Sequence, residues 1–175
     1  MKTRINLLFF IIFSILSFAQ APSNDSIVRK KITAVRIDKS VKIDGNLDED
    51  IWKDIPVAKD FVELRPNNGK PENQDFKSEV KVMYDDTGIY IGAMLYDKEP
   101  SKISRELTER DGIGNDDFFV LFINGYNDKQ QSLELFVTAA GVQADSKFTT
   151  DNGEDFSWNG IWYSGVKILE NGWSV

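Results

Sequence analysis

The sequence contains neither cysteine nor histidine. Without cysteine, the chain cannot form disulfide bonds, zinc–thiolate centres or a cysteine nucleophile. Without histidine, it lacks the side chain that most often serves as a general base near neutral pH and most often ligates a metal. A Ser-His-Asp triad and a His-ligated haem or zinc site are therefore excluded. Any chemistry must come from carboxylates, lysine, tyrosine or hydroxyl groups.

Clustered positive charge is also lacking. The 175 residues include 21 Lys and Arg against 28 Asp and Glu, which gives a formal net charge of -7. Nucleic-acid binding needs clustered Lys and Arg at the phosphates, and anionic lipid surfaces attract polybasic segments. We therefore expect no nucleic acid among the partners, and no electrostatic binding to anionic lipid.

Residues 1–19 have the pattern of a secretory signal peptide. Lys2 and Arg4 precede an apolar run over residues 7–16, and Ser17 and Ala19 place small side chains where a signal peptidase reads the chain. The run is shorter than the roughly 20 residues of a membrane span, so we predict cleavage before Gln20 and a flexible lead-in over residues 20–33. The expected location is the periplasm, the outer-membrane surface or the extracellular space. Export without cysteine suits a bacterial envelope.

From residue 34 onward, short apolar runs alternate with Gly, Asn and Asp clusters, which is typical of strands and turns. Residues 80–84 and 89–95 alternate with period two around a turn at Asp85-Asp86-Thr87-Gly88, and this pattern predicts a β-hairpin. Residues 118–123 are apolar throughout, which indicates a central strand covered on both faces. Leu47, Ile51 and Ile55 recur at a four-residue spacing before Pro56, and they predict one short helix.

Other strands are expected at residues 35–37, 41–43, 133–138, 142–148 and 162–169, and one more begins at Trp173. Roughly eight to ten short strands and a single short helix indicate an all-β fold, an antiparallel β-sandwich of immunoglobulin-like or jelly-roll-like type. Because the last strand is unfinished at Val175, we expect one domain over residues 34–175 that is truncated at its carboxy-terminal end.

Five stretches carry a resemblance to a known family. Residues 41–52 read VKIDGNLDEDIW and residues 82–92 read VMYDDTGIYIG; Arg110-Asp111, Asp116-Asp117-Phe118 and Asn171-Gly172-Trp173 follow. In this order they resemble the family-nine carbohydrate-binding modules and their relatives. The resemblance implies a β-sandwich that binds glycan chain ends between aromatic rings, sometimes with a structural calcium ion. It is strongest to amino-terminal modules of large exported proteins of Bacteroidetes-type bacteria, which implies a downstream domain of unknown function in the same longer chain.

Two tryptophans are the first candidates for a sugar-binding surface. Trp158 and Trp162 lie in a stretch rich in aromatic, polar and Gly residues, with Asp155 and Asn159 beside them. A sugar presents an apolar face of C–H groups and an edge of hydroxyls, so a flat ring beside planar donors and acceptors suits it. Trp52, by contrast, lies on the predicted helix and is expected in the core. One or both of the candidate tryptophans packing into the core is the alternative.

A second cluster precedes the predicted central strand. Arg110 and Asp111 can grip sugar hydroxyls, and Asp116 and Asp117 offer the hard oxygen ligands that calcium takes. The spacing does not match a known calcium-loop pattern, so a solvated loop with ion pairs is the competing interpretation. Asp145, Asp151 and Asp155 are interpreted as exposed loop acids.

The preferred function is non-catalytic binding of an oligo- or polysaccharide, within a cell-envelope protein linked to glycan breakdown or uptake. A structural or docking module without a ligand is the alternative; exposed tryptophan rings would favour sugar binding, and an apolar patch without a polar rim would favour docking. A glycoside hydrolase is less favoured, because no pair of acids can be assigned the separation that its chemistry requires. Relatives that act on glycosidic bonds would owe this activity to attached domains. A related haem-binding sandwich normally needs a histidine ligand, and the chain has none.

Overall fold

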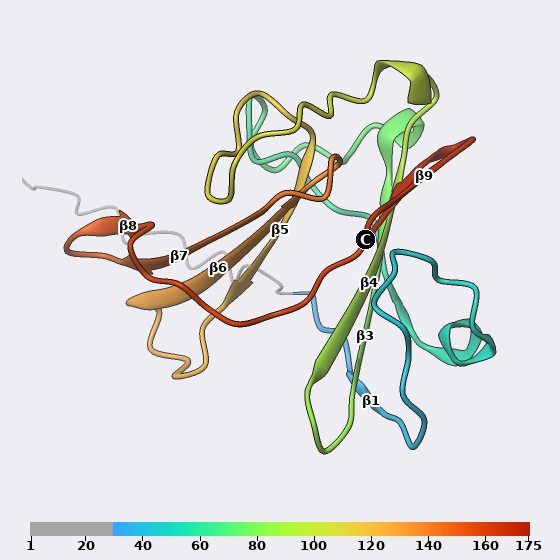
Figure 1. Ribbon diagram of the computed structural model, residues 1–175, viewed down its shortest axis with the longest axis horizontal. Helices are drawn as coiled ribbons and strands as arrows, with labels where there is room; N and C mark the ends of the chain where they lie inside the picture. Colours follow the sequence, from blue (N-terminus) through green and yellow to red (C-terminus); the bar gives the residue numbers. More distant parts are fainter. Residues whose placement is uncertain (1–29) are drawn as a thin grey trace, which may run out of the picture. The chain divides into compact units, whose positions relative to one another are not determined.

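The computed structural model describes residues 30–175. The predicted signal peptide and residues 20–29 of the lead-in lie outside the described residues. Within residues 30–175, no helix has the length and apolar character needed to cross a membrane. The described part is built from ten strands and three short 3-10 helices, which confirms the predicted all-β class (Figure 1).

Six of these strands form the first sheet, in the order β1-β3-β4-β10-β9 with β2 paired to β3. Strand β1 runs parallel to β3, and the other pairs are antiparallel. The strands are β1 (Val35–Arg36), β2 (Val57–Ala58), β3 (Ser78–Tyr84), β4 (Ile89–Tyr96), β9 (Lys167–Leu169) and β10 (Gly172–Ser174).

Strands β3 and β4 form the predicted hairpin. The Asp85 carboxylate closes its turn by accepting hydrogen bonds from the backbone N–H groups of Thr87 (2.7 Å) and Gly88 (3.0 Å). Such side-chain bonds are the reason that Asp favours turns. The short segment Asp85-Asp86-Thr87-Gly88 therefore fixes the register of the longest strand pair of this sheet.

The second sheet has four antiparallel strands in sequence order: β5 (Phe118–Ile123), β6 (Gln131–Thr138), β7 (Gln143–Thr149) and β8 (Gly153–Asp155). One face of it packs on the first sheet. A buried cluster joins Ala139, directly after β6, to Trp173 of β10, with Phe119 of β5 and Leu95 of β4 packed against it. This contact between the faces of two sheets is the arrangement of a β-sandwich.

A second cluster lies on the opposite face of the first sheet. Trp52 is only 4% exposed there, in the 3-10 helix η1 (Asp50–Asp54), and its ring lies over Gly92 of β4. A Cβ atom at Gly92 would stand 2.8 Å from the Trp52 ring and 2.7 Å from the Leu47 side chain. The prediction that Trp52 belongs to the core is confirmed, and the absence of a side chain at Gly92 is what allows the close approach.

Some local predictions were wrong. Strand β5 is an edge strand, not a central one: it pairs only with β6 among the described residues, and Phe118 and Phe122 are 44% and 59% exposed. Its apolar run gave no information about long-range pairing. The predicted helix is limited to the five residues of η1. Leu47, which was expected on its apolar face, packs from the loop that precedes it. Two further 3-10 turns, η2 (Gln74–Phe76) and η3 (Pro100–Lys102), were not anticipated.

Two other segments are not strands. Residues 41–43 form a loop in which the Lys42 N–H donates to the Glu49 carboxylate (3.1 Å). The strand predicted over residues 162–169 is formed only at Lys167–Leu169. In both segments the alternating apolar pattern is present, but no strand of the described chain lies alongside to pair with it.

Candidate functional site

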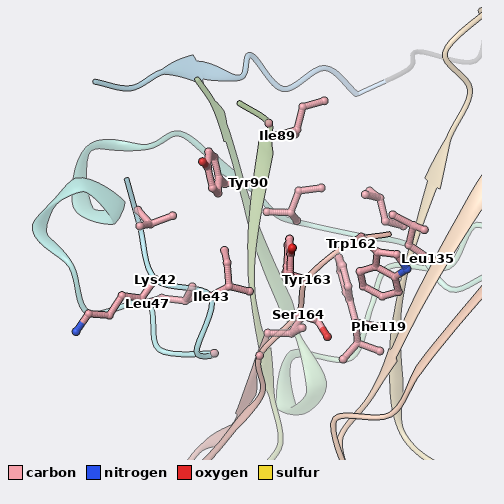
Figure 2. Close-up of a pocket in the computed structure, with 18 of the residues that line it drawn as sticks. Lys42, Ile43, Leu47, Ile89, Tyr90, Phe119, Leu135, Trp162, Tyr163 and Ser164 are labelled. Carbon is pink, nitrogen blue, oxygen red and sulfur yellow. The ribbon is translucent and has the colours of Figure 1, made fainter. Parts of the chain in front are cut away.

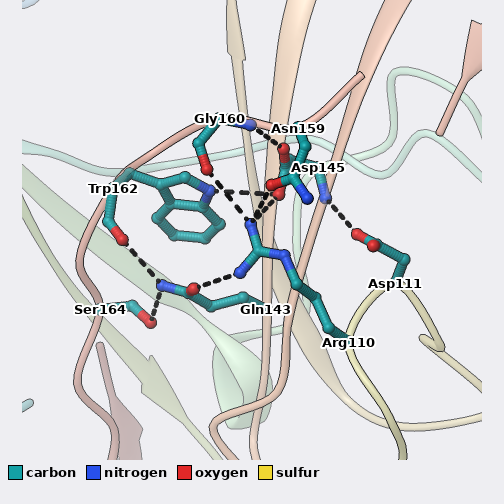
Figure 3. Close-up of polar contacts among 8 residues, drawn as sticks. All are labelled: Arg110, Asp111, Gln143, Asp145, Asn159, Gly160, Trp162 and Ser164. Carbon is teal, nitrogen blue, oxygen red and sulfur yellow. Dashed lines mark hydrogen bonds and ion pairs between the residues drawn. The ribbon is translucent and has the colours of Figure 1, made fainter. Parts of the chain in front are cut away.

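A buried carboxylate organises the polar cluster that contains most of the candidate residues. Asp145 lies in the middle of β7 and its side chain is 0% exposed. It forms an ion pair with Arg110 and accepts hydrogen bonds from the Gly160 N–H (2.5 Å) and the Trp162 indole N–H (3.4 Å). One acid therefore connects a loop before β5, strand β7 and the segment after β8 (Figure 3).

The guanidinium of Arg110 is held from several directions. It donates to Gln143 Oε1 (2.7 Å), to Asn159 Oδ1 (3.3 Å) and to the Gly160 carbonyl (3.4 Å), besides its ion pair with Asp145. Its side chain remains 37% exposed. Because a guanidinium is planar and its donors point in fixed directions, these contacts fix one orientation, while part of the side chain stays open to solvent.

Asp111 supports the same loop from the backbone side. Its carboxylate accepts a hydrogen bond from the Asp145 N–H (3.2 Å), and its own N–H donates to the Gln143 carbonyl (3.0 Å). The Asp111 backbone has a φ of 68°, a left-handed conformation that Asp tolerates better than most residues. Asp111 therefore positions Arg110 over β7.

The two candidate tryptophans flank Gly160. A Cβ atom at this glycine would lie 2.9 Å from the Trp158 ring and 3.5 Å from the Trp162 ring. Both indoles are partly buried, so neither is fully exposed and neither lies in the core. Trp162 is further fixed because its carbonyl and the neighbouring Ser164 hydroxyl both accept hydrogen bonds from Gln143 Nε2 (3.4 and 2.9 Å).

Asp155 has a local role. Its carboxylate accepts hydrogen bonds from the Ser157 hydroxyl (2.6 Å) and the Ser157 N–H (2.9 Å), and these bonds lower its pKa below the usual range. It shapes the turn that leads into Trp158. The structure thus joins Arg110, Asp111, Asn159 and Trp162 in one cluster, with Trp158 beside it and Asp155 at its margin.

Sequence reasoning missed Gln143, Asp145 and Ser164. Asp145 was interpreted as an exposed loop acid, and this was wrong, since it is fully buried in β7. In the sequence, Gln143, Asp145 and Lys147 alternate with Val142, Ala144 and Ser146, which looks like a solvent face. The register shows otherwise: Asp145 opposes Leu135 and Gln143 opposes Val137, on the face that meets the first sheet. The sequence carried no signal for this, because the face of β7 that turns inward depends on its register against β6.

An apolar pocket of about 610 Å³ adjoins Trp162, and Arg110, Asp145 and Asn159 are not among its lining residues. Figure 2 shows Phe119 and Leu135 of the second sheet beside Trp162, with Leu47 and Ile43 across β4 from them. Trp162 therefore belongs to both the polar cluster and the pocket: its indole N–H donates to Asp145, and the residue also lines the pocket.

The acids proposed as calcium ligands are used within the loop before β5. Asp116 Oδ1 accepts from the Glu106 N–H (2.7 Å) and the Ser104 hydroxyl (3.3 Å), and Asp117 Oδ2 accepts from the Ser104 N–H (2.8 Å). Asp116 is 6% exposed and its Oδ2 atom has no partner. Within residues 30–175, no group of three or more acids is arranged to hold a metal ion. A calcium site at these residues stays a prediction.

Comparison with known proteins gives one match. Neither the curated proteins nor the solved structures include a similar chain. Residues 43–175 match the model of a family described as carbohydrate family 9 binding domain-like. This range contains both sheets except β1, and all the residues of the polar cluster. The chain therefore belongs to the carbohydrate family 9 binding domain-like family.

Proposed function

We propose that the chain binds a carbohydrate at the surface formed by Arg110, Asn159 and Trp158, with Trp162 behind them. The family supports carbohydrate binding in general. The observation that carries the site is the fixed guanidinium of Arg110 beside two indoles, on a side chain that is 37% exposed. A planar donor set can bond to hydroxyls while a neighbouring ring covers the C–H face of the sugar.

The charge of the site favours neutral sugars. The positive charge of Arg110 is balanced by Asp145, and Asp111 adds a further acid in direct contact with the backbone of β7. The nearby Asp155 adds a further negative charge, and its hydrogen bonds from Ser157 lower its pKa and so favour the ionised form. A polyanionic glycan would meet net negative charge here and on the chain as a whole. We expect neutral oligosaccharides to bind in preference to uronate-rich or sulfated ones.

The proposed role is binding without catalysis. Glycosidic cleavage uses one acid that protonates the leaving group and a second that acts as nucleophile or base. At this site the Asp145 carboxylate accepts bonds from Arg110, Gly160 and Trp162 and is 0% exposed, so it is not available to a substrate. The held guanidinium of Arg110 and the two indoles beside it are features of a rigid recognition surface, and they support binding.

The cellular setting is also a proposal. The signal-peptide pattern of residues 1–19 supports export to the periplasm or cell surface, where the module would attach a longer envelope protein, through its downstream domain, to glycan. A calcium ion bound near Asp116 is compatible with the unpartnered Oδ2 atom of that residue. The calcium idea is tested below by titrating with calcium and with a chelator.

The test is a titration of residues 20–175 with cello-, xylo- and malto-oligosaccharides, followed by tryptophan fluorescence, with calcium and with a chelator. We expect saturable binding that weakens at least about tenfold in Trp158→Ala and in Asn159→Ala, which corresponds to about 1.4 kcal/mol. Phe76→Ala and Asn152→Ala are the matched controls, since both residues are exposed and contact neither indole nor Arg110. Equal affinity in the site variants and the controls, or no binding by the folded chain, would refute the proposal.

A further inference from the structure

The apolar pocket beside Trp162 is lined from both faces of the first sheet. Phe119 and Leu135 line it from the second sheet, while Leu47 lines it from the opposite side of β4 (Figure 2). Leu121 and Trp52 also line the pocket. A pocket confined between two sheets would contact one face of β4. This pocket extends around an edge of β4, so part of that edge must be uncovered.

The uncovered edge is the first half of β4. Strand β10 pairs with β4 only from Tyr96 to Met94, and Val175 then exchanges both backbone hydrogen bonds with Ala93 (2.8 and 3.0 Å). Every second residue of a strand directs its N–H and C=O to the same edge, so Ile91 and Ile89 direct theirs where Ala93 does. Within residues 30–175 no strand pairs with them there, and both residues line the pocket.

The opposite wall of the pocket is the segment that precedes β9. Strand β9 pairs with β10 through Ile168↔Trp173 and Lys167↔Ser174. Continuing this register places Val166 next to Val175, and residues 161–165 alongside the line in which β10 points. Residues 161–165 line the pocket but have no strand partner among the described residues. Ile161 and Tyr163 are 96% and 81% exposed. A gap therefore lies beyond the end of β10, between the first half of β4 on one side and residues 161–165 on the other.

We propose that the pocket is a slot for one further β-strand, an extended polypeptide segment that continues from Val175 in line with β10 and antiparallel to β4. In the register of β10 with β4, the second and fourth residues after Val175 would oppose Ile91 and Ile89. They would exchange backbone hydrogen bonds with them and direct their side chains toward Phe119 and Leu135. The first and third would oppose Gly92 and Tyr90 and face Leu47.

The slot therefore selects a strand that is apolar on both faces. Such a strand would pair the backbone groups of Ile91 and Ile89, which have no strand partner at that edge among the described residues. It would also cover the exposed side chains of Ile89, Ile161 and Tyr163, and the part of Trp162 that lines the pocket. The proposal does not depend on sugar binding, because the edge at Ile91 and Ile89 is not part of the proposed sugar surface.

The experiment compares residues 20–175 with two extended forms. One carries Ile-Val-Ile-Val after Val175; its matched control carries Ile-Pro-Ile-Val, in which proline removes the N–H that would bond to the Ile91 carbonyl. The measurements are amide exchange at Ile91, the thermal midpoint, and binding of a hydrophobic dye. We expect the first extension to slow Ile91 exchange at least tenfold, to raise the midpoint and to reduce dye binding, and the proline control to do none of these.

Equal exchange at Ile91 in all three forms would overturn the proposal, as would equal stabilisation by both extensions, which would indicate unspecific apolar contact. If the unextended chain does not fold, the same comparison still decides: folding restored by the first extension alone supports the slot, and folding restored by both or by neither contradicts it. Sugar affinity is measured separately, so loss of binding without a change at Ile91 refutes only the proposed function.

Discussion

The Arg110–Asp145 pair should show a marked asymmetry when either partner is removed. Arg110→Ala leaves the Asp145 carboxylate, which is 0% exposed, with only the Gly160 and Trp162 N–H groups as donors. Breaking a buried pair in this way costs about 3–5 kcal/mol. Because the Arg110 side chain is 37% exposed, water can approach the vacated site, and we expect the lower end, about 3 kcal/mol.

Removal of the acid should cost less. Asp145→Ala leaves a guanidinium that is already partly in water and that keeps Gln143 Oε1 as an acceptor at 2.7 Å. The Gly160 and Trp162 N–H groups also lose their acceptor, but both residues are only partly buried, so water can replace the carboxylate. We therefore expect the loss typical of hydrogen bonds to a charged group, about 2 kcal/mol. The double variant has no unpaired buried charge. Its free energy of unfolding should therefore lie within a few tenths of a kcal/mol of that of Asp145→Ala alone.

The assay is urea unfolding of residues 20–175 at 25 °C, followed by circular dichroism, with the free energy of unfolding compared across the cycle. Arg36→Ala is the matched control, since Arg36 pairs with Asp86 at 2.7 Å but the two side chains are 57% and 82% exposed. Exposed pairs contribute about 0–1 kcal/mol. If Asp145→Ala proved as costly as Arg110→Ala, or if the two losses were additive, the reasoning from burial would be refuted.

Three further expectations follow from other parts of the fold. Gly92→Ala should destabilise the chain by about 1–3 kcal/mol in urea unfolding, because its Cβ would overlap the Trp52 ring, whereas Gly88→Ala, with no atom within 4 Å, should not; equal effects would contradict the packing. Hydrogen bonds from the Thr87 hydroxyl and N–H lower the Asp85 pKa to about 2. The stability that the ionised Asp85 contributes is therefore fully present above the pKa of this residue in the unfolded chain, and it is lost as pH falls from about 4 to about 2. The thermal midpoint of Asp85→Asn should therefore fall less than that of the unchanged chain between these two pH values. Ser146→Ala should lower the free energy of unfolding by about 1–3 kcal/mol, because it removes the 2.5 Å hydrogen bond to the buried Glu134 carboxylate. Adding Glu134→Leu should recover part of that loss. No recovery would mean that the loss does not come from a carboxylate left without a donor.

Local patterns predicted the parts of the fold that are stabilised locally. The hairpin of β3 and β4 followed from period-two alternation around Asp85, and the strand at Gln143–Thr149 followed from the same kind of pattern. The position of a strand within a sheet depends on partners far along the chain. The apolar run Phe118–Ile123 was for this reason correctly predicted as a strand but wrongly placed at the centre.

The candidate site was predictable in its exposed members and not in its organising one. Arg110, Asn159 and Trp162 are residue types that suit sugars, and the structure brings them together across 49 and more positions of sequence. Asp145 could not be identified as their common partner, because its burial depends on the register of β7 against β6 and on the return of the chain at Gly160. Composition reports which side chains are available, and pairing decides which of them meet.

The two errors at residues 41–43 and 162–166 have one physical origin, which connects them to the slot. Both segments have the alternating apolar pattern of strands, and residues from both, including Val41, Ile43 and Trp162, line the same pocket. A strand pattern predicts pairing only if a partner edge is present, since an isolated extended segment has no backbone hydrogen bonds to stabilise it. If a strand continued from Val175 along Ile91 and Ile89, residues 161–165 would gain that edge. The same comparison of extended chains should then show protection at Tyr163 together with Ile91; protection at Ile91 alone would mean that the slot is filled from the β4 side only.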